Sequence, residues 1–287
     1  MSTEAAVLAS PLRGAHALWH GGGGAGSTSR RRRVRHRLRT LATEYPGPYL
    51  RFARRKYPGP SPRVIGPDTE AVIDGYTRSA STFAVYAFQV AQPTPVRLAH
   101  HLHAPAQLMA AARRGLPTLM VIREPRGAVL SQLVREPDVD LLDALYSYRR
   151  FHRSLMPYRD AMVVADFREV TADFGAVVRR MNQRFDTSFG VWGGTPAELA
   201  LCTALIEQRP TLSPTLLGFE SGETTLSEAK AHLATSAGSA GGDATWIPSA
   251  ERDAAKAGLE RLWASPRVAV ARGEAMRCYR EFTGDAS

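Results

Sequence analysis

The chain has 287 residues, 44% of them hydrophobic, which is enough to bury a substantial core as one large domain with an appendage. No run approaches the roughly eighteen uninterrupted apolar residues that a membrane span needs, and the N-terminus lacks the basic-then-apolar pattern of a secretory signal. The two cysteines, Cys202 and Cys278, show no metal-type spacing, so neither a disulfide framework nor a structural zinc is expected. These features predict a cytoplasmic protein, with peripheral contact to a membrane left open.

The formal net charge of +10 is concentrated near the N-terminus. Residues 1–63 carry 13 Lys and Arg against 2 Asp and Glu, whereas the rest of the chain carries 24 against 25. The sequence therefore predicts two parts: a flexible, Gly/Ser-rich and basic N-terminal arm over residues 1–62, and an α/β domain over residues 63–287.

The arm contains a basic stretch that begins at Arg30, after a Gly/Ser segment expected to be too flexible to pack. Val34, Leu38 and Leu41 fall at helical spacing in this stretch. A basic amphipathic helix suits an anionic membrane surface, an acidic partner or RNA; the alternative is a solvated helix laid on the domain by its few apolar residues. No aromatic interleaving or helix-turn-helix pattern is present, so specific nucleic-acid binding is not expected.

Short apolar runs then alternate with longer helical patterns. This alternation predicts an α/β fold, a three-layer P-loop-type domain with a central parallel sheet flanked by helices. The expected strands are Ala71–Ile73, Pro95–Ala99, Thr118–Ile122 and Met162–Asp166. The expected helices are Thr82–Gln92, Ala104–Arg114, Arg126–Arg135, Asp140–Leu155 and Asp173–Phe185.

The C-terminal third is predicted to be mainly helical. A helix is expected to begin after Thr195, with Glu198 completing a capping box, and to end at Pro210. The Gly/Ser/Thr-rich residues 218–246 favour a mobile lid or a long loop. Two further helices are expected at Ser249–Ala264 and Pro266–Phe282.

The loop after the first expected strand reads Gly-Tyr-Thr-Arg-Ser-Ala-Ser-Thr over residues 75–82. It has the layout of a phosphate-binding loop, but Ala80 stands at the second glycine and Ser81 at the lysine of an ATP- or GTP-binding loop. Hydroxyls, a helix N-terminus and Arg78 still suit an anion held without a metal. An ordinary strand-to-helix turn capped by Ser79 or Ser81 is the alternative.

A second candidate anion site follows the third expected strand. Arg123 stands where that strand ends, and Ser131 lies eight residues further on in the next helix. Because ligands of parallel sheets bind beyond the carboxyl ends of the strands, this pair suits a second, separate phosphate. The alternative is a salt bridge from Arg123 to Glu124 or Glu136.

Together these residues resemble the sulfotransferase family that uses 3′-phosphoadenosine 5′-phosphosulfate (PAPS). Its P-[KR]-S-G-[TN]-T-[FW] motif is matched by residues 77–83, its R-x-P-x-x-x-x-x-S element by residues 123–131, and the resemblance covers roughly residues 70–190. It implies sulfuryl transfer from PAPS to a hydroxyl without a metal. The implied cofactor-binding residues are Arg78, Ser79, Ala80, Ser81, Thr82, Arg123 and Ser131.

This chain departs from the family's pattern at several points. Thr77 replaces the proline of the first motif and Ala80 its glycine. The late basic element that some members use for the 3′-phosphate is missing, and Lys230 and Arg252 are the candidates for its role.

Three histidines lie between the two motifs. His103 matches the family's H-x-P context for a general base, and His101 better matches the separation from the arginine, so both are catalytic candidates together with Arg78. Histidine suits this role because its ordinary pKa of about 6.5 leaves it mostly neutral at cellular pH. In an extended segment His101 and His103 would share one face and His100 the other. A metal site is the alternative, but no third ligand is evident and no metal is expected.

Two other classes of function stay open. One is a P-loop kinase-like phosphotransferase, and the other is a non-catalytic nucleotide-binding protein. The acceptor of a sulfotransferase could be a small molecule, a lipid or a sugar, and the sequence does not select among them.

Overall fold

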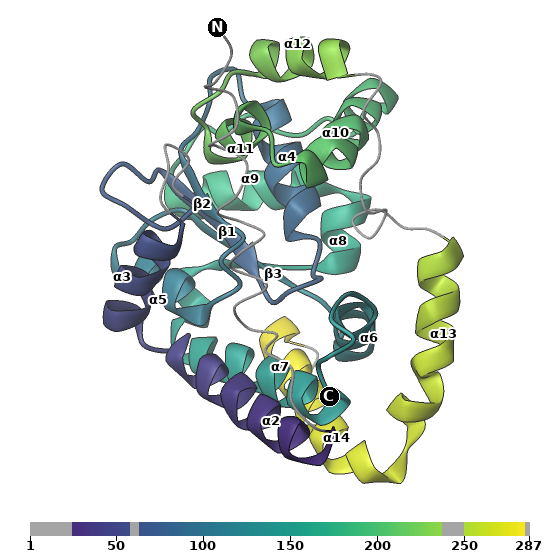
Figure 1. The fold of residues 1–287 in the computed structure, drawn as a ribbon. Helices are drawn as coiled ribbons and strands as arrows, with labels where there is room; N and C mark the ends of the chain where they lie inside the picture. The colour runs from purple at the N-terminus through teal and green to yellow at the C-terminus, as the bar shows by residue number, and fades with distance from the viewer. Residues whose placement is uncertain (1–24, 58–62, 237–249, 285–287) are drawn as a thin grey trace, which may run out of the picture.

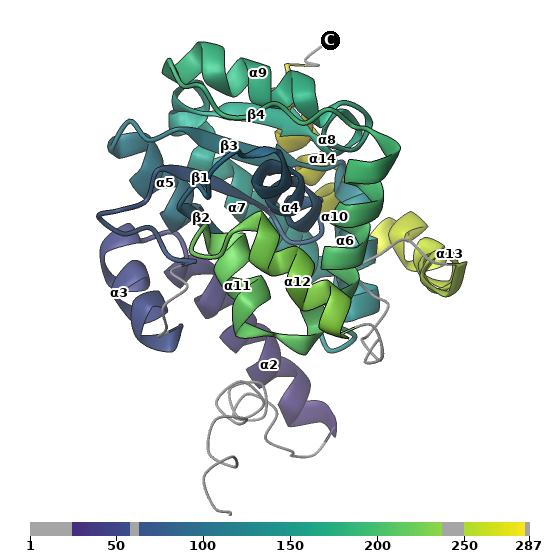
Figure 2. The same cartoon turned by 90° about the horizontal axis from the view of Figure 1, so that it is seen from above.

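A computed structural model of the chain describes residues 25–57, 63–236 and 250–284, and its centre is a parallel sheet with helices on both faces (Figures 1 and 2). The four strands run in the order β2-β1-β3-β4. They are β1 (Ala71–Gly75), β2 (Leu98–His100), β3 (Thr118–Ile122) and β4 (Val163–Asp166). The α/β class and the parallel sheet flanked by helices are confirmed.

The helices account for most of the remaining described residues. Most of the predicted helices are found within two residues of their expected bounds, whereas α3, α8, α11 and α12 were not predicted. The α-helices are α2 (Ala25–Ala42), α3 (Pro46–Lys56), α4 (Ser81–Ala91), α5 (Pro105–Arg113), α6 (Pro125–Arg135), α7 (Leu141–Leu155), α8 (Phe167–Ala172), α9 (Phe174–Phe185), α10 (Pro196–Gln208), α11 (Pro214–Ser221), α12 (Leu226–Ser236), α13 (Ala250–Ala264) and α14 (Ala269–Thr283). The 3₁₀ helices are η1 (Met156–Ala161), η2 (Arg209–Thr211) and η4 (Pro266–Val268).

The sheet separates two hydrophobic cores because successive side chains of a strand point to opposite faces. Val72 and Met120 face a core formed with α5, α6, α7 and α14. Ile73 and Leu119 face the other core, formed with α4, α9, α10 and α11. Both faces are therefore covered, which explains why the strands read as continuous apolar runs. Among the described residues, no helix combines the length and the apolar character needed to cross a bilayer.

The strand order creates a switch point at the carboxyl end of β1. The chain leaves β1 for β2 on one side and later returns to β3 on the other side of β1. The helices that follow β1 and β2, α4 and α5, pack on opposite faces of the sheet. In open parallel sheets this is the position where ligands bind.

The prediction of a lid or long loop at residues 218–246 is wrong over most of its length. Residues 218–221 complete α11, and residues 226–236 form α12, while residues 237–249 lie outside the described part. The backbone N–H of Glu228 bonds Thr225 Oγ1, and the Glu228 carboxylate accepts from the backbone N–H of Thr225. This capping box starts α12, and its T-x-x-E pattern is visible in the sequence despite the Gly/Ser/Thr-rich surroundings.

The basic stretch forms α2, which lies along α7 (Figure 1). The helix starts at Ala25 and not at Arg30, so the second half of the Gly/Ser segment is helical; its first half lies outside the described residues. Polar contacts hold α2 in place, such as His36 Nε2 to Ser147 Oγ at 2.7 Å, while Val34 and Leu38 are 51% and 61% exposed. Val34 and Leu38 therefore do not hold α2 against the domain. The boundary at residue 62 stays a prediction, since contacts do not tell which part folds alone.

Candidate anion-binding site

The loop between β1 and α4 is shaped by two residues with left-handed backbone conformation. Arg78 has φ +67° and Ala80 has φ +71°, and each costs about 1–2 kcal/mol for a residue other than glycine. A Cβ on Gly75 would lie 2.1 Å from the carbonyl oxygen of Val121, so the loop must start at glycine. The first free N–H groups of α4 lie at the end of this turn. Such a strained turn in front of a helix N-terminus is typical of functional sites.

Two buried hydroxyls in this loop lack a hydrogen-bond partner. Ser79 is 1% exposed and Ser81 is 3% exposed, and neither Oγ contacts a donor or acceptor among the described residues. An unsatisfied buried polar group costs about 1–3 kcal/mol. Neither serine caps α4, because Ala80 occupies the N-cap position. The alternative of an ordinary capped turn therefore does not account for these residues.

The structure joins the two predicted phosphate sites into one. Arg78 Nε donates to Ser131 Oγ at 3.0 Å, and Arg123 Nη1 donates to the Arg78 carbonyl oxygen at 3.0 Å. A Cβ on Gly127 would lie 2.8 Å from Arg123 Nε, so this glycine leaves room for the arginine beside the first turn of α6. On its other side the Arg123 guanidinium lies 3.9 Å from the centre of the Phe167 ring.

Arg123 does not form the salt bridge that was its alternative explanation. The Glu124 carboxylate is engaged as the N-cap of α6, where it accepts from the backbone N–H groups of Arg126 and Gly127. Across the described ranges, no carboxylate lies within ion-pair distance of Arg123. Its guanidinium instead donates to the Arg78 carbonyl oxygen and lies over the Phe167 ring.

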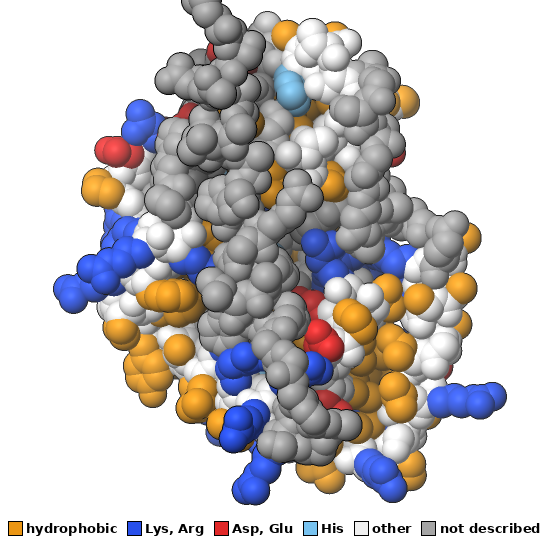
Figure 3. Space-filling view, viewed as in Figure 1, with side chains coloured by type: hydrophobic (Ala, Val, Ile, Leu, Met, Phe, Trp, Pro, Cys, Tyr) orange, Lys and Arg blue, Asp and Glu red, His pale blue; other side chains and the backbone are white. Residues whose placement is uncertain are grey.

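Arg78, Arg123, Arg135 and Arg252 gather at this position, and their positive charges disfavour one another. Burial, followed by the charges of Arg252, Arg135 and Arg123, lowers the pKa of Arg78 from 12.5 to about 10. Burial, again followed by Arg252, lowers the pKa of Arg123. Figure 3 shows basic side chains gathered in the hollow between the body of the protein and α13. A cluster that disfavours its own charge is stabilised by a bound anion.

The late basic residue at this site is Arg252. It lies in the first turn of α13, a helix held on α6 by the bidentate pair of Arg126 with Glu260 at 3.1 and 2.8 Å. The other candidate, Lys230, is exposed on α12, which packs on α10 and α11. Sequence order alone could not distinguish the two.

His103 is placed beside the loop by a buried carboxylate that the sequence analysis missed. Asp74, within β1, accepts from the backbone N–H groups of Leu102 and His103 and from Gln107 Nε2. His103 Nδ1 lies 2.9 Å from the Gly75 carbonyl oxygen and 3.3 Å from Asp74 Oδ1. A carbonyl only accepts, so Nδ1 carries the proton and Nε2 is the basic nitrogen. Among the described residues Nε2 has no partner, and the side chain is 32% exposed. An acidic residue inside an apolar strand was the available signal for Asp74.

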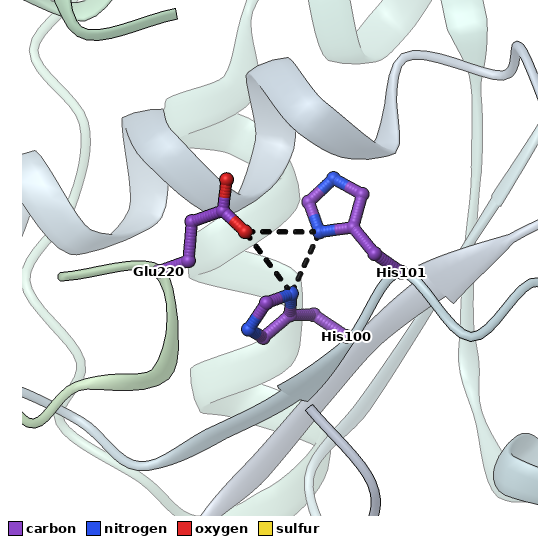
Figure 4. A group of neighbouring side chains, drawn as sticks. All are labelled: His100, His101 and Glu220. Carbon is purple, nitrogen blue, oxygen red and sulfur yellow. Dashed lines mark hydrogen bonds and ion pairs between the residues drawn. The ribbon is translucent and has the colours of Figure 1, made fainter. Parts of the chain in front are cut away.

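His101 and His100 differ from the prediction. His101 has φ +50°, so the chain leaves the extended conformation and the expected alternation of faces is wrong. The two Nδ1 atoms lie 2.6 Å apart, and Glu220 Oε2 from α11 lies 3.7 Å and 3.8 Å from them (Figure 4). Glu220 is also ion-paired with Arg209. No local sequence pattern indicated that Glu220 or Arg209 would lie beside the histidines.

Glu220 is the third ligand type that the sequence did not show: its carboxylate and the two histidine nitrogens lie within 4.8 Å of one another, although the two nitrogens are closer together than in a zinc site. Two nitrogens bound to one zinc at about 2.0–2.1 Å would lie roughly 3.3 Å apart. At 2.6 Å the nitrogens share a hydrogen bond instead. Burial lowers the pKa of His100 to about 3 and that of His101 well below 6.5, so both rings are neutral.

No family model, no curated protein and no solved structure matches this chain.

Proposed function

We propose that this protein is a sulfotransferase that moves a sulfuryl group from PAPS to a hydroxyl of an acceptor. The observation that carries the proposal is a set of three groups at the switch point of the sheet: the buried hydroxyls of Ser79 and Ser81, which lack a hydrogen-bond partner, and the guanidinium of Arg123, which lacks a carboxylate partner among the described residues. All three groups can donate to an anion, and none has a partner of opposite charge in the described part of the chain. Their combination at a ligand-binding position favours a ligand with more than one anionic group.

The proposed roles follow the two motifs. Backbone N–H groups at Ala80 and Ser81, with both serine hydroxyls and Arg78, would hold the 5′-phosphosulfate. Arg123 and Ser131, joined by Arg252, would hold the 3′-phosphate. Arg78 donates to Ser131, and the Arg78 carbonyl oxygen accepts from Arg123. The residues of the two motifs would therefore bind the nucleotide as one connected site.

His103 is the proposed base. In the reaction the acceptor oxygen attacks sulfur, the bond between sulfur and the phosphate oxygen breaks, and the acceptor proton moves to His103 Nε2. The leaving group is 3′,5′-adenosine diphosphate, whose charge Arg78 and the N-terminus of α4 would stabilise. Asp74 would hold the ring in the tautomer that keeps Nε2 basic.

The test is isothermal titration with 3′,5′-adenosine diphosphate and, separately, with ATP in the presence and absence of Mg²⁺. We expect the diphosphate to bind without a metal and more tightly than ATP. Magnesium-dependent binding and turnover of ATP would favour the kinase-like alternative. Diphosphate binding without transfer to any of a panel of phenols, sugars and lipid alcohols would favour the non-catalytic alternative.

A further inference from the structure

Thr82 is the end of a continuous hydrogen-bond chain that leads away from the anion loop. Its Oγ1 lies 3.0 Å from His101 Nε2, and His101 Nδ1 lies 2.6 Å from His100 Nδ1. His100 Nε2 lies 3.2 Å from Ser221 Oγ, and that hydroxyl in turn lies 3.1 Å from the Leu217 carbonyl oxygen. Four side chains are thus linked end to end: Thr82 from the first turn of α4, His100 at the end of β2, His101 directly after it, and Ser221 from α11.

The far end of the chain fixes the direction of every bond. A carbonyl can only accept, so Ser221 donates its single proton to Leu217, as serines within helices commonly do. His100 Nε2 must then donate to Ser221. Because the His100 ring is neutral, its Nδ1 carries no proton and accepts from His101 Nδ1. The His101 ring is neutral too, so its Nε2 accepts, and Thr82 donates.

We infer that His100, His101 and Ser221 hold the Thr82 hydroxyl as a hydrogen-bond acceptor toward the ligand. With its proton committed to His101, Thr82 presents only oxygen lone pairs to the site. These would repel a phosphate or sulfate oxygen and would accept from an O–H group. The inference rests on the proposed function for its ligand: the group opposite Thr82 is the hydroxyl of the acceptor alcohol, and Thr82 is not a ligand of the nucleotide.

Glu220 places a negative charge beside the middle of this chain. Burial alone would raise the pKa of Glu220, but the charge of Arg209 brings it below its ordinary value, so Glu220 is an anion. Its Oε2 lies 3.7 Å from His100 Nδ1 and 3.8 Å from His101 Nδ1, so it stabilises the single proton shared by these two nitrogens, while the contact of Ser221 with Leu217 decides which ring carries that proton. His101, His100 and Glu220 are therefore positioning residues that act on the ligand through Thr82.

The first test reads the tautomers directly. The full chain, labelled with ¹⁵N-histidine and treated with EDTA, is measured by long-range ¹H–¹⁵N correlation at pH 7.5, with His100→Gln and His101→Gln variants for assignment. We expect a protonated Nδ1 and a bare Nε2 on His101, and a protonated Nε2 and a bare Nδ1 on His100. The inference would be overturned by the opposite tautomers or by a doubly protonated ring. It would also be overturned if added zinc shifted the Nδ1 signals of both rings. This readout does not depend on PAPS.

The second test separates Thr82 from the unsatisfied serines. We expect Thr82→Val to change the affinity for 3′,5′-adenosine diphosphate by less than about twofold, and Ser81→Ala to weaken it about tenfold. Thr82→Ser, which keeps the hydroxyl, controls for folding and packing. A loss in Thr82→Val as large as in Ser81→Ala would contradict the inference. If the unmodified chain does not bind the diphosphate, the proposed function fails. The tautomers of His100 and His101 would still show whether the hydrogen-bond chain has the inferred direction.

Discussion

Arginines in two regions of this protein differ in how they are neutralised. On α2, Arg37 lies 3.0 Å from Asp143 and Arg32 lies 3.3 Å from Asp138, and both arginines are nearly half exposed. At the anion loop, Arg123 has no carboxylate partner in the described ranges, and Arg78 is depressed in pKa by burial and by three other arginines. The charges of the first group are balanced by carboxylates of the protein itself, whereas the charge of Arg123 is not, and the proposed function assigns it to a ligand.

The comparison shows which basic residues of an arginine-rich chain point to function. Net charge draws attention to the N-terminal stretch, where the arginines are most dense. Yet a pair that is exposed on both sides, such as Arg32 with Asp138, typically contributes less than 1 kcal/mol. The loop arginines are few, but they stand beside unsatisfied serines at the switch point. The candidate site is identified by polar and basic side chains that lack a partner in the protein, more than by a high density of charge.

The largest expected effect concerns histidines that the fold keeps neutral. The pKa is lowered to about 3 in His100 and about 4 in His152, against about 6.5 in the unfolded chain. The unfolded state therefore binds more protons below pH 6.5, and stability falls with pH through this window. For these two residues we expect a loss of about 3 kcal/mol between pH 6.5 and 5, because the slope per residue grows from about half of 1.4 kcal/mol per pH unit at pH 6.5 to nearly all of it at pH 5. Urea unfolding across this range measures it.

His152→Gln provides the matched control, because it removes one of the two titrating rings. The variant starts less stable, but the slope of its free energy of unfolding against pH should be smaller by about one proton. An equal slope in both proteins would show that His152 is not kept neutral by the fold.

The next effect tests the difference between two neighbouring histidines. Only His103 combines an open Nε2 with partial exposure, since both nitrogens of His101 are engaged. Replacing His103 with Ala should lower turnover with PAPS and a responsive acceptor about a hundredfold, with diphosphate affinity nearly unchanged. Full activity in this variant would move the base elsewhere. Loss of diphosphate binding together with activity would instead assign His103 a structural role.

A smaller effect concerns the outward face of α2. Arg31, Val34 and Leu38 share this face, opposite the contacts with α7, and we propose that it meets an anionic membrane surface. Arg31→Ala and Leu38→Ala should each lower the affinity for vesicles containing phosphatidylserine by about 1 kcal/mol, roughly fivefold, as measured by co-sedimentation. Added salt should weaken the binding further. Arg37→Ala is the control, and an equal loss in that variant would indicate unspecific charge attraction.

The smallest effect concerns the backbone of the loop. Ala80 bears a left-handed conformation that glycine adopts without steric cost. Ala80→Gly should raise the free energy of unfolding by up to about 1 kcal/mol, because relief of about 1–2 kcal/mol exceeds the added freedom of the unfolded chain. Ala84→Gly, inside α4, should lower it by about 1 kcal/mol or more. If chemical denaturation shows both variants destabilised, the loop does not strain Ala80.

Features carried by local pattern were predictable from the sequence. Strand β3 coincides with its predicted bounds because an apolar run of five residues is bordered by breaks in the pattern. The places of Arg123 at the end of β3 and of Ser131 in α6 were predictable, because the strand and the helix follow each other closely in the sequence. The capping box of α10, formed by Thr195 and Glu198, was also predicted from the sequence.

Features made by long-range contact were not predictable. Glu220 meets His100 and His101 only because α11 packs beside β2. Arg252 reaches the loop only because α13 docks on α6. The left-handed turn at His101 depends on hydrogen bonds to Asp74 just beyond it, and nothing in the histidine-rich segment itself indicates such a turn.

The most direct measurement compares one arginine from each region in the same assay. Isothermal titration of 3′,5′-adenosine diphosphate is carried out with the unmodified chain, Arg123→Ala and Arg37→Ala. Loss of a charge-assisted contact of about 1.5–3 kcal/mol predicts an affinity ten- to a hundredfold weaker for Arg123→Ala, and unchanged for Arg37→Ala. Unchanged binding in Arg123→Ala, or equal losses in both variants, would contradict the claim that Arg123, which has no carboxylate partner among the described residues, holds the nucleotide.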